Sequence, residues 1–512
     1  MKFIHLLLVL LPLLISCTDD SITPGTETTV LSLISDEDRR PLVHFTPPQN
    51  WMNDPNGMVY YKGEYHLFYQ YHPGGTKWGP MHWGHAVSTD LLNWTDRPVA
   101  LFPDEHGTIF SGSIVVDAAN TTGFKSGSED PLVAIYTSAG AKQTQSIAYS
   151  NDRGTTWVKY PGNPVLPNPG INDFRDPKVI WHESTGKWIM SLATGREISF
   201  YSSTNLKEWT LESVFGKGLG AQGGVWECPD LFPMKVENSS ETKWVLLVSL
   251  NPGGPNGGSA TQYFAGDFDG SVFTPEATTV SWVDYGTDNY AGVTFANIPP
   301  ADGRRIMIGW MSNWVYAELV PTVAWRSTMT LPRELTLVKH NDRHQLISTP
   351  VAELSNYAGT AEMVAVQNNQ VIENHETILS GSYVMDFSVP FASGDSLSIT
   401  IGNAIEKFTI LFDGMNNKVS LDRSKSGPNT FHQFFNAVQR AGLGDAADTK
   451  KLDVKLVVDQ TSVELFWNSG KDQMTALFFP KYGYNQLKFS WTSDKSVLSE
   501  VKLVPLKKSV RK

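Results

Sequence analysis

The chain has 512 residues, a formal net charge of −11 and a pI near 5.6. Its length exceeds what one hydrophobic core usually supports, so we expect two or three domains. The negative charge argues against nucleic acid or an anionic lipid surface as a partner, and a composition with 11% aromatic and only 18% charged residues excludes a disordered chain.

The first residues predict export to the cell envelope. "FIHLLLVLLPLLIS" follows Lys2 and is too short to span a bilayer, which is typical of a secretory signal peptide. "LISC" at 14–17 resembles a bacterial lipobox, which implies a lipoprotein signal peptide over 1–17 and lipidation of Cys17. That lipid would anchor the protein at the outer membrane, facing the periplasm or the outside. The alternative is an ordinary signal peptide with an incidental cysteine.

The residues from 18 to 40 begin with "TDDSITPGTETTV", a polar run that predicts a flexible tether. Without Cys17, the only cysteine is Cys228, so no disulfide within the chain is expected. The sequence contains no CxxC, HExxH or EF-hand motif, so we expect neither a metal nor another cofactor.

From residue 41 to 350, short strand-like runs alternate with turn residues. "EYHLFYQY", "LVAIYTS" and "WVLLVSL" are examples, and helical periodicity is nearly absent. "AVSTDLLNW" (86–94), "AYSNDRGTTW" (148–157) and "FYSSTNLKEW" (200–209) form a faint repeat, with tryptophans 63 and then 52 positions apart. This period fits a four-stranded propeller blade and predicts about five blades, although unrelated hairpins with similar turns are an alternative.

The C-terminal part follows a different pattern. Residues 351–360, "VAELSNYAGT", predict a short helical linker. Over residues 361–508, runs such as "DSLSITIG" and "KLDVKLVVDQTSVELFWN" alternate with period two, which predicts an antiparallel β-sandwich. The predicted fold is therefore all-β, a five-bladed propeller followed by a β-sandwich.

Three acidic residues stand out because their neighbours are apolar or proline, where an unpaired charge is costly. Asp54 lies in "WMNDPNG", Asp176 in "NDFRDPKV" and Glu227 in "GGVWECPDLFP". They are 122 and 51 residues apart, or roughly two blades and one blade. Because the innermost strands of a propeller converge on its axis, the three acids are expected to meet there. The alternative is that each is only a turn or cap residue.

The environments of the three acids predict different roles. Glycoside cleavage requires one carboxyl group that is protonated near neutral pH and another that is ionised. Poor solvation beside Trp226 favours Glu227 as the acid, and N–H groups of an Asp-Pro-Asn-Gly turn favour Asp54 as the nucleophile. The neighbouring Arg175 is expected to keep Asp176 ionised, so that it stabilises positive charge in the transition state.

"WMNDPNG", "FRDP" and "WECPD", together with "FSGS", "DNYAG", "GWMSNW" and "LPRELTL", resemble glycoside hydrolase family 32, the β-fructofuranosidases, from about residue 41 onward. The resemblance implies a retaining mechanism in which Asp54 is the nucleophile, Glu227 the acid and base, and Asp176 the transition-state stabiliser. It also implies a substrate pocket lined by Asn53, Gln70, Trp78, Phe110, Ser111, Arg175 and Trp310. Trp51, Trp83, Trp226 and Trp314 are expected either to line this pocket or to pack the core.

"GWMSNWVYAELVPT" resembles bacterial levanases and exo-inulinases, so the expected substrate is levan or inulin, cut from the terminal fructose, with sucrose as a minor substrate. The alternatives are an endo-levanase that releases oligosaccharides, a related five-bladed hydrolase of arabinan or xylan, and a surface lipoprotein that binds fructan without cutting it. The last would have no reason to keep all three acids.

Overall fold

The computed structural model describes residues 31–446, 450–492 and 498–508. The predicted signal peptide with Cys17, and residues 18–30 of the predicted tether, lie outside the described residues. The last part of that tether is bound to the folded chain. Ile34 N donates to Lys481 O at 3.1 Å, and the Asp36 carboxylate accepts from the backbone N–H groups of Val323 and Ala324. The prediction of a flexible tether is therefore wrong for these residues.

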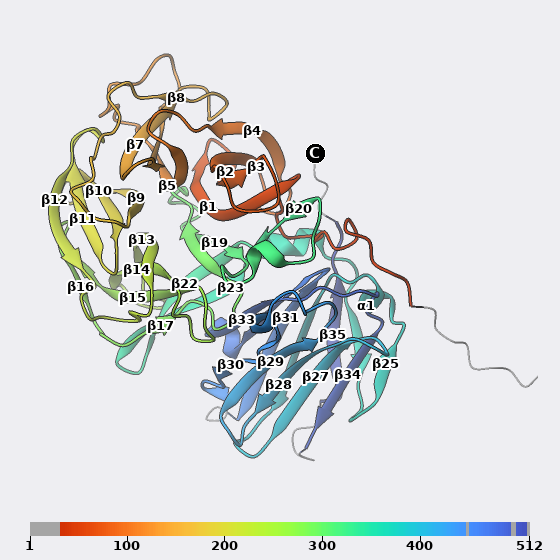
Figure 1. Ribbon diagram of the computed structural model, residues 1–512. Coiled ribbons are helices and arrows are strands. Elements are labelled where there is room, and N and C mark those ends of the chain that lie inside the picture. Colours follow the sequence, from red (N-terminus) through yellow and green to blue (C-terminus); the bar gives the residue numbers. More distant parts are fainter. Residues whose placement is uncertain (1–30, 447–449, 493–497, 509–512) are drawn as a thin grey trace, which may run out of the picture. The chain divides into compact units, whose positions relative to one another are not determined.

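Five sheets form a propeller, and the predicted number of blades is confirmed (Figure 1). In spatial order, the first blade contains β20 (Trp325–Arg326), β1 (Asn50–Tyr61), β2 (Glu64–His72), β3 (His82–Ser88) and β4 (Thr95–Leu101). The second contains β5 (Thr108–Val116), β6 (Leu132–Ala139), β7 (Gln143–Ser150) and β8 (Val158–Lys159). The third contains β9 (Phe174–His182), β10 (Lys187–Thr194), β11 (Ile198–Ser203) and β12 (Thr210–Phe215).

The last two blades each carry one extra short strand. The fourth contains β13 (Val225–Lys235), β14 (Thr242–Asn251), β15 (Ala260–Phe268) and β16 (Phe273–Pro275), and β17 (Ser281–Trp282) also pairs with β15. The fifth contains β18 (Tyr290–Thr294), β19 (Arg305–Met311), β22 (Arg333–His340) and β23 (Arg343–Pro350), and β21 (Thr328–Met329) pairs with β19.

The faint sequence repeat corresponds to one part of the blade. Each of its three copies runs from the third strand of a blade (β3, β7 or β11) through a turn to a tryptophan. In the second and third copies, the indole N–H of Trp157 donates to Gly154 O, and that of Trp209 to Leu206 O. In these two copies, the repeated pattern of residue types thus reflects a turn that the tryptophan holds closed before the outermost strand begins.

Apolar side chains fill the spaces between neighbouring blades. Val59, Phe68 and Trp83 of the first blade pack with Ile114 and Tyr136 of the second, and similar clusters join the following blades. The ring closes where Tyr60 N donates to Ala296 O and Ala296 N donates to Met58 O, both at 2.9 Å. Strands buried on both faces explain why the central runs of the sequence are almost continuously apolar.

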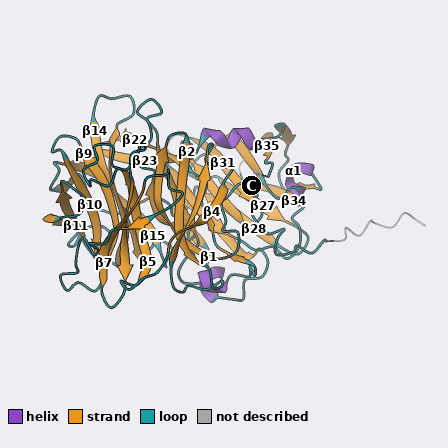
Figure 2. Ribbon diagram, turned by 90° about the horizontal axis from the view of Figure 1, so that it is seen from above, coloured by secondary structure: helices purple, strands orange, loops and turns teal. Residues whose placement is uncertain are grey.

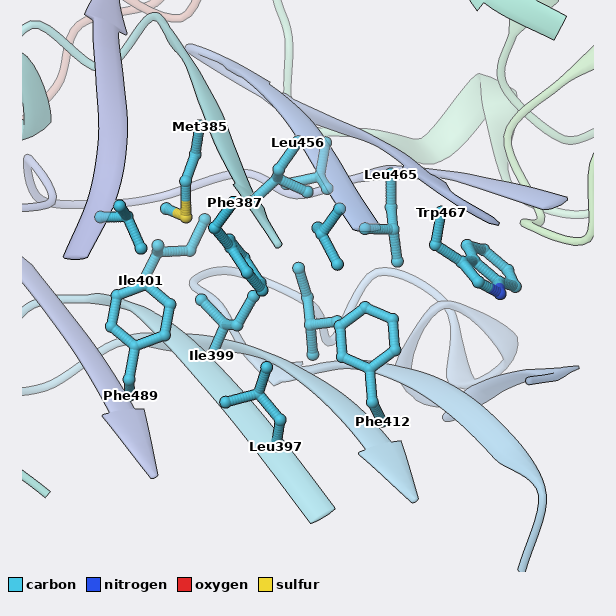
Figure 3. Packing of buried hydrophobic residues seen from close by; sticks show 14 of the residues in the cluster. Met385, Phe387, Leu397, Ile399, Ile401, Phe412, Leu456, Leu465, Trp467 and Phe489 are labelled. Atoms are coloured by element: carbon cyan, nitrogen blue, oxygen red, sulfur yellow. The ribbon is translucent and has the colours of Figure 1, made fainter. Parts of the chain in front are cut away.

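Two six-stranded sheets form the C-terminal β-sandwich. One has the order β24 (Glu362–Ala365), β35 (Glu500–Pro505), β26 (Tyr383–Pro390), β31 (Lys451–Asp459), β32 (Ser462–Trp467), β33 (Asp472–Leu477). The other has the order β25 (Val371–Glu373), β34 (Gln486–Trp491), β27 (Ser396–Gly402), β28 (Lys407–Asp413), β29 (Lys418–Lys425), β30 (Gln439–Gly442). Figure 3 shows Leu397, Ile399 and Ile401 of one sheet facing Phe387 and Leu465 of the other, as the period-two pattern requires.

Helices are few and short within the described residues, and strands dominate (Figure 2). They are α1 (Glu376–Leu379) and the 3₁₀ helices η1 (Ala317–Leu319), η2 (Ala352–Tyr357), η3 (Gln433–Asn436) and η4 (Asn468–Gly470). Helix η2 lies in the segment predicted as the helical linker.

Buried ion pairs join the propeller to the sandwich. Arg333 of β22 binds Glu464 of β32 at 2.5 Å and Asp284 at 3.0 Å. His44 lies 2.9 Å from the second oxygen of Glu464 and 2.7 Å from Asp459. Although burial lowers it, these two carboxylates raise the pKa of His44 to about 9, so the imidazole is a cation in this network.

Candidate active site

The first strands of the five blades, β1, β5, β9, β13 and β18, contact one another in a ring around the axis. Each has an irregularity in its pairing near the same end. The shifts fall at Asn53–Asp54, Phe110–Ser111, Asp176–Pro177, Cys228–Pro229 and Ala291–Gly292. A bulge bends its strand and changes the direction of a side chain. Five bulges at one end of the propeller therefore turn these residues toward the axis.

"WMNDPNG" was predicted to form a turn, and this prediction is wrong. Residues 50–61 form one continuous strand, β1, with irregular pairing between Met52 and Pro55 and again between Asn56 and Val59. The residue types that favour turns also suit bulges, because both need backbone conformations outside the extended region. Gly57 provides such a conformation, with a φ of +52°.

A cavity of about 290 Å³ opens at the bulged ends of the strands. All three predicted catalytic acids line it, as do six of the seven predicted substrate residues. The full lining is Asn53, Asp54, Gln70, Trp78, Phe110, Ser111, Gln143, Arg175, Asp176, Glu227 and Trp314. The structure thus brings together residues from the first four blades and from the segment that follows β19.

Trp310 is the predicted substrate residue that does not line the cavity. It is fully buried, and its ring packs against Trp51 and, at 4.8 Å, against Trp314, which lines the cavity in its place. Trp51, Trp83 and Trp226 are also fully buried and belong to the core. Residue type alone could not decide between these positions, because packing decides which indole faces the cavity.

Side chains hold the Asp54 carboxylate in place. Asn53 Nδ2 donates to Asp54 Oδ1 at 3.0 Å, and Ser111 Oγ donates to Oδ2 at 2.7 Å. The indole N–H of Trp51 donates to Asn53 Oδ1 at 2.7 Å, which fixes the Asn53 amide so that its NH₂ group faces Asp54. The expected backbone N–H donors are not among the partners of Asp54 within the described residues. Donors on both oxygens fix the orientation of the carboxylate.

Cys228 connects the carboxylates. Its backbone N–H donates to Asp176 Oδ2 at 3.1 Å, and its Sγ lies 3.5 Å from Asp54 Oδ2 and 3.7 Å from Asp176 Oδ2. Burial raises the pKa of this thiol well above its ordinary value, so Cys228 stays neutral, and its one S–H lies within weak donating distance of either acid. Asp176 and Cys228 both have positive φ, 66° and 45°, a strained backbone that the bulges maintain.

Arg175 mainly binds Glu227, not Asp176 as expected. Its Nε and Nη2 donate to Glu227 Oε1 at 3.1 and 2.9 Å, whereas Asp176 Oδ2 lies 3.9 Å away. Asp173 accepts from the other arm of the guanidinium at 2.5 Å. The hydroxyl of Tyr290 donates to Glu227 Oε2, so both oxygens of Glu227 have a donor. Tyr290 belongs to the "DNYAG" motif, but the motif alone did not assign it a partner.

Burial dominates the protonation of these acids. It raises the pKa of Asp176 to about 7, against the opposing charge of Arg175 and with the help of the Glu227 and Asp54 carboxylates. Burial also raises the pKa of Glu227, while Arg175 and the Tyr290 hydroxyl oppose this. Asp176 and Glu227 therefore both hold their protons to a higher pH than ordinary carboxyl groups do. Arg175 opposes the rise in the pKa of Asp176 but does not cancel it, and its expected role of keeping Asp176 ionised stays a prediction.

Gln143 was missed by the sequence analysis. Its Oε1 accepts from Phe174 N at 2.8 Å and lies 3.5 Å from Arg175 Nη1, so its position at the start of β7 supports the strand that carries Arg175. A glutamine in the run "QTQS" gives no signal of this role.

Carboxyl groups with different donors around one cavity at the axis of a propeller are the arrangement that glycoside cleavage requires. The model of the glycosyl hydrolases family 32 N-terminal domain matches residues 44–350, and that of the family 32 C-terminal domain matches residues 353–505. The chain belongs to glycosyl hydrolase family 32.

Known proteins of this family are similar over nearly the whole chain. The levanase of Bacillus subtilis is 49% identical over 92% of this chain and 71% of its own length. An extracellular exo-inulinase of Aspergillus niger is 40% identical over 87% of this chain and 90% of its own. The crystal structure of the exo-inulinase from Aspergillus awamori has a TM-score of 0.85 at 34% identity, over 92% of this chain and 99% of that one.

Proposed function

We propose that this protein releases terminal fructose from β-fructans, levan or inulin, with sucrose as a minor substrate. The observation that carries the proposal is that Asp54 and Glu227 line one small cavity with different partners. A cavity of about 290 Å³ suits one terminal sugar unit, whereas an endo-acting enzyme needs a cleft that a chain can cross. The similarity to a levanase and to exo-inulinases favours the same substrates.

In the proposed mechanism, the ionised Asp54 attacks the anomeric carbon of the terminal fructosyl unit. Protonated Glu227 gives its proton to the leaving oxygen, so a covalent fructosyl-enzyme forms and the shortened chain departs. Glu227 then takes a proton from water, which attacks the same carbon and releases fructose with retained configuration. Asp176 accepts hydrogen bonds from the sugar hydroxyls and stabilises the positive charge that develops on the ring.

The test is hydrolysis of levan, inulin and sucrose by the mature protein, with products resolved over time. We expect free β-fructofuranose from the earliest points, identified by NMR before it equilibrates. A ladder of oligosaccharides would contradict exo action, an inverted first product would contradict the covalent mechanism, and no product would favour a binding protein.

Substitutions separate the catalytic roles. Glu227→Ala should lower the hydrolysis rate by at least ~10²-fold, the usual contribution of a general acid, and Asp54→Ala should lower it further. Glu129→Ala is the matched control, because Glu129 is a surface carboxylate held by Lys62 and Arg153 away from the cavity. Near wild-type turnover in either site variant would exclude the assigned role.

We also propose attachment to the cell envelope through a lipid on Cys17. The "LISC" segment supports this. In a bacterial host, the wild-type protein should fractionate with membranes, and Cys17→Ala should lose this association. Equal fractionation of both would contradict lipidation.

A further inference from the structure

One exposed aromatic side chain lines the cavity, and a second lies at the same end of the first blade. Trp78, 45% exposed, lines the cavity together with Phe110, and their rings meet edge to face at 6.1 Å. Farther along the chain, Phe102 is 55% exposed, and His82 packs edge to face against it at 5.5 Å. Phe102 directly follows β4, and His82 begins β3, so both lie at the end of the first blade where the cavity opens.

Backbone contacts tie this end of the blade to the wall of the cavity. Ile109 N donates to Met81 O at 3.0 Å, and the Trp83 indole donates to Phe110 O at 3.0 Å. The residues from Trp78 to His82 can span at most about 14 Å when extended, the length of a short oligosaccharide. His82, and Phe102 beside it, therefore lie within the reach of a chain whose terminal unit fills the cavity.

A single exposed phenylalanine is ordinary on a protein surface, but the backbone of Phe102 is fixed. Lys159 of β8 donates to Phe102 O and forms an ion pair with Asp104 Oδ2 at 2.5 Å. Asp104 and Gly107 in turn exchange two backbone hydrogen bonds, which close the loop between β4 and β5. The loop that carries this exposed ring is thus fixed, so a ligand that stacks on the ring does not have to order the loop.

His82 adds a hydrogen-bond acceptor to this surface. Its Nδ1 lies 3.0 Å from Pro80 O, so Nδ1 carries the proton and donates to the carbonyl. Burial lowers the pKa of His82, which keeps the ring neutral and leaves Nε2 as an acceptor. Within the described residues, no group donates to Nε2. A ring face beside a neutral acceptor suits an uncharged polyhydroxy ligand rather than an anion.

We propose that Phe102 and His82 form a distal subsite, which binds a fructosyl unit of the chain beyond the two units joined by the scissile bond. This inference rests on the proposed release of fructose from β-fructans. The subsite makes longer chains better substrates, because their additional units contact Phe102.

The test compares kcat/KM for sucrose with that for a series of fructo-oligosaccharides and for levan and inulin. Phe102→Ala should lower kcat/KM on the longer chains about five- to tenfold, mainly through KM, which corresponds to about 1–1.4 kcal/mol. The value for sucrose should stay within about twofold, and Phe102→Tyr, which keeps the ring, should restore the activity on long chains.

Trp181→Ala is the matched control, because Trp181 is 36% exposed and lies near the opposite end of the third blade. Equal losses on sucrose and on long chains, or no loss on either, would overturn the subsite while leaving the proposed function intact. If the wild-type enzyme cleaves sucrose but none of the longer fructans, both the subsite and the proposed function are overturned.

Discussion

Replacing Tyr290 by phenylalanine tests how the structure sets the protonation of Glu227. The Tyr290 hydroxyl donates to Glu227 Oε2 and stabilises the ionised carboxylate, which lowers the pKa of Glu227 against the effect of burial. A hydrogen bond to a charged acceptor is worth roughly 1.5–3 kcal/mol, and 1.36 kcal/mol corresponds to one pH unit. Without the hydroxyl, the acid keeps its proton to higher pH.

The assay is the pH dependence of kcat/KM for sucrose, from which the alkaline limb is read. In Tyr290→Phe, this limb should move upward by about one pH unit or more, and the maximal rate should fall because Glu227 loses a positioning contact. The displacement of this limb relative to the wild type measures the change in the pKa of the acid.

Tyr61→Phe provides the matched control. The Tyr61 hydroxyl donates to the Glu129 carboxylate at 3.1 Å, which is the same kind of contact at a surface site away from the cavity. Its removal should leave the pH profile unchanged. If the alkaline limb of Tyr290→Phe stays in place or moves downward while the protein remains folded, the assignment of Glu227 as the titrating acid is refuted.

Two further predictions concern stability. Arg333→Met should lower the free energy of unfolding by about 3–5 kcal/mol in chemical denaturation, because it removes the guanidinium that binds both Asp284 and Glu464 in the interior and leaves only His44 beside Glu464. Arg304→Met, at a solvent-accessible pair, should cost less than about 1 kcal/mol. Similar losses in both would contradict this role of the buried network. The ring nitrogens of His66 and His85 lie 3.1 Å apart, and burial lowers the pKa of His66 to about 4 and that of His85 well below its ordinary value. As the pH is lowered, the unfolded chain therefore binds protons before the folded chain does. The free energy of unfolding should fall as the pH drops from about 6.5 to 4, by about 3 kcal/mol for His66 alone. Thermal unfolding across this range should show a weaker dependence of the melting temperature on pH for His66→Gln than for the wild type. An unchanged pH dependence would exclude the histidine pair as its source.

The sequence predicted most of the fold because its patterns are local. Alternation such as that in "DSLSITIG" gives the inward Leu397, Ile399 and Ile401 of the sandwich, and the repeat ending in Trp94, Trp157 and Trp209 marks equivalent turns in three blades. The spacing of the acids also predicted correctly that they meet at the axis, since a propeller returns to its axis once per blade.

Only the tertiary structure decided the environment of each site residue. "WMNDPNG" specifies unusual backbone conformations, but the pairing of β1 with β2 makes them a bulge instead of a turn. Arg175 immediately precedes Asp176 in the chain, yet successive side chains of a strand point in different directions. The guanidinium of Arg175 therefore reaches Glu227 on the neighbouring blade. Likewise, Trp310 and Trp314 are equivalent as residue types, and packing alone buries one and turns the other toward the cavity. Local sequence thus determined which groups are present and on which strand, whereas their partners and protonation depend on contacts between blades that are distant in the chain.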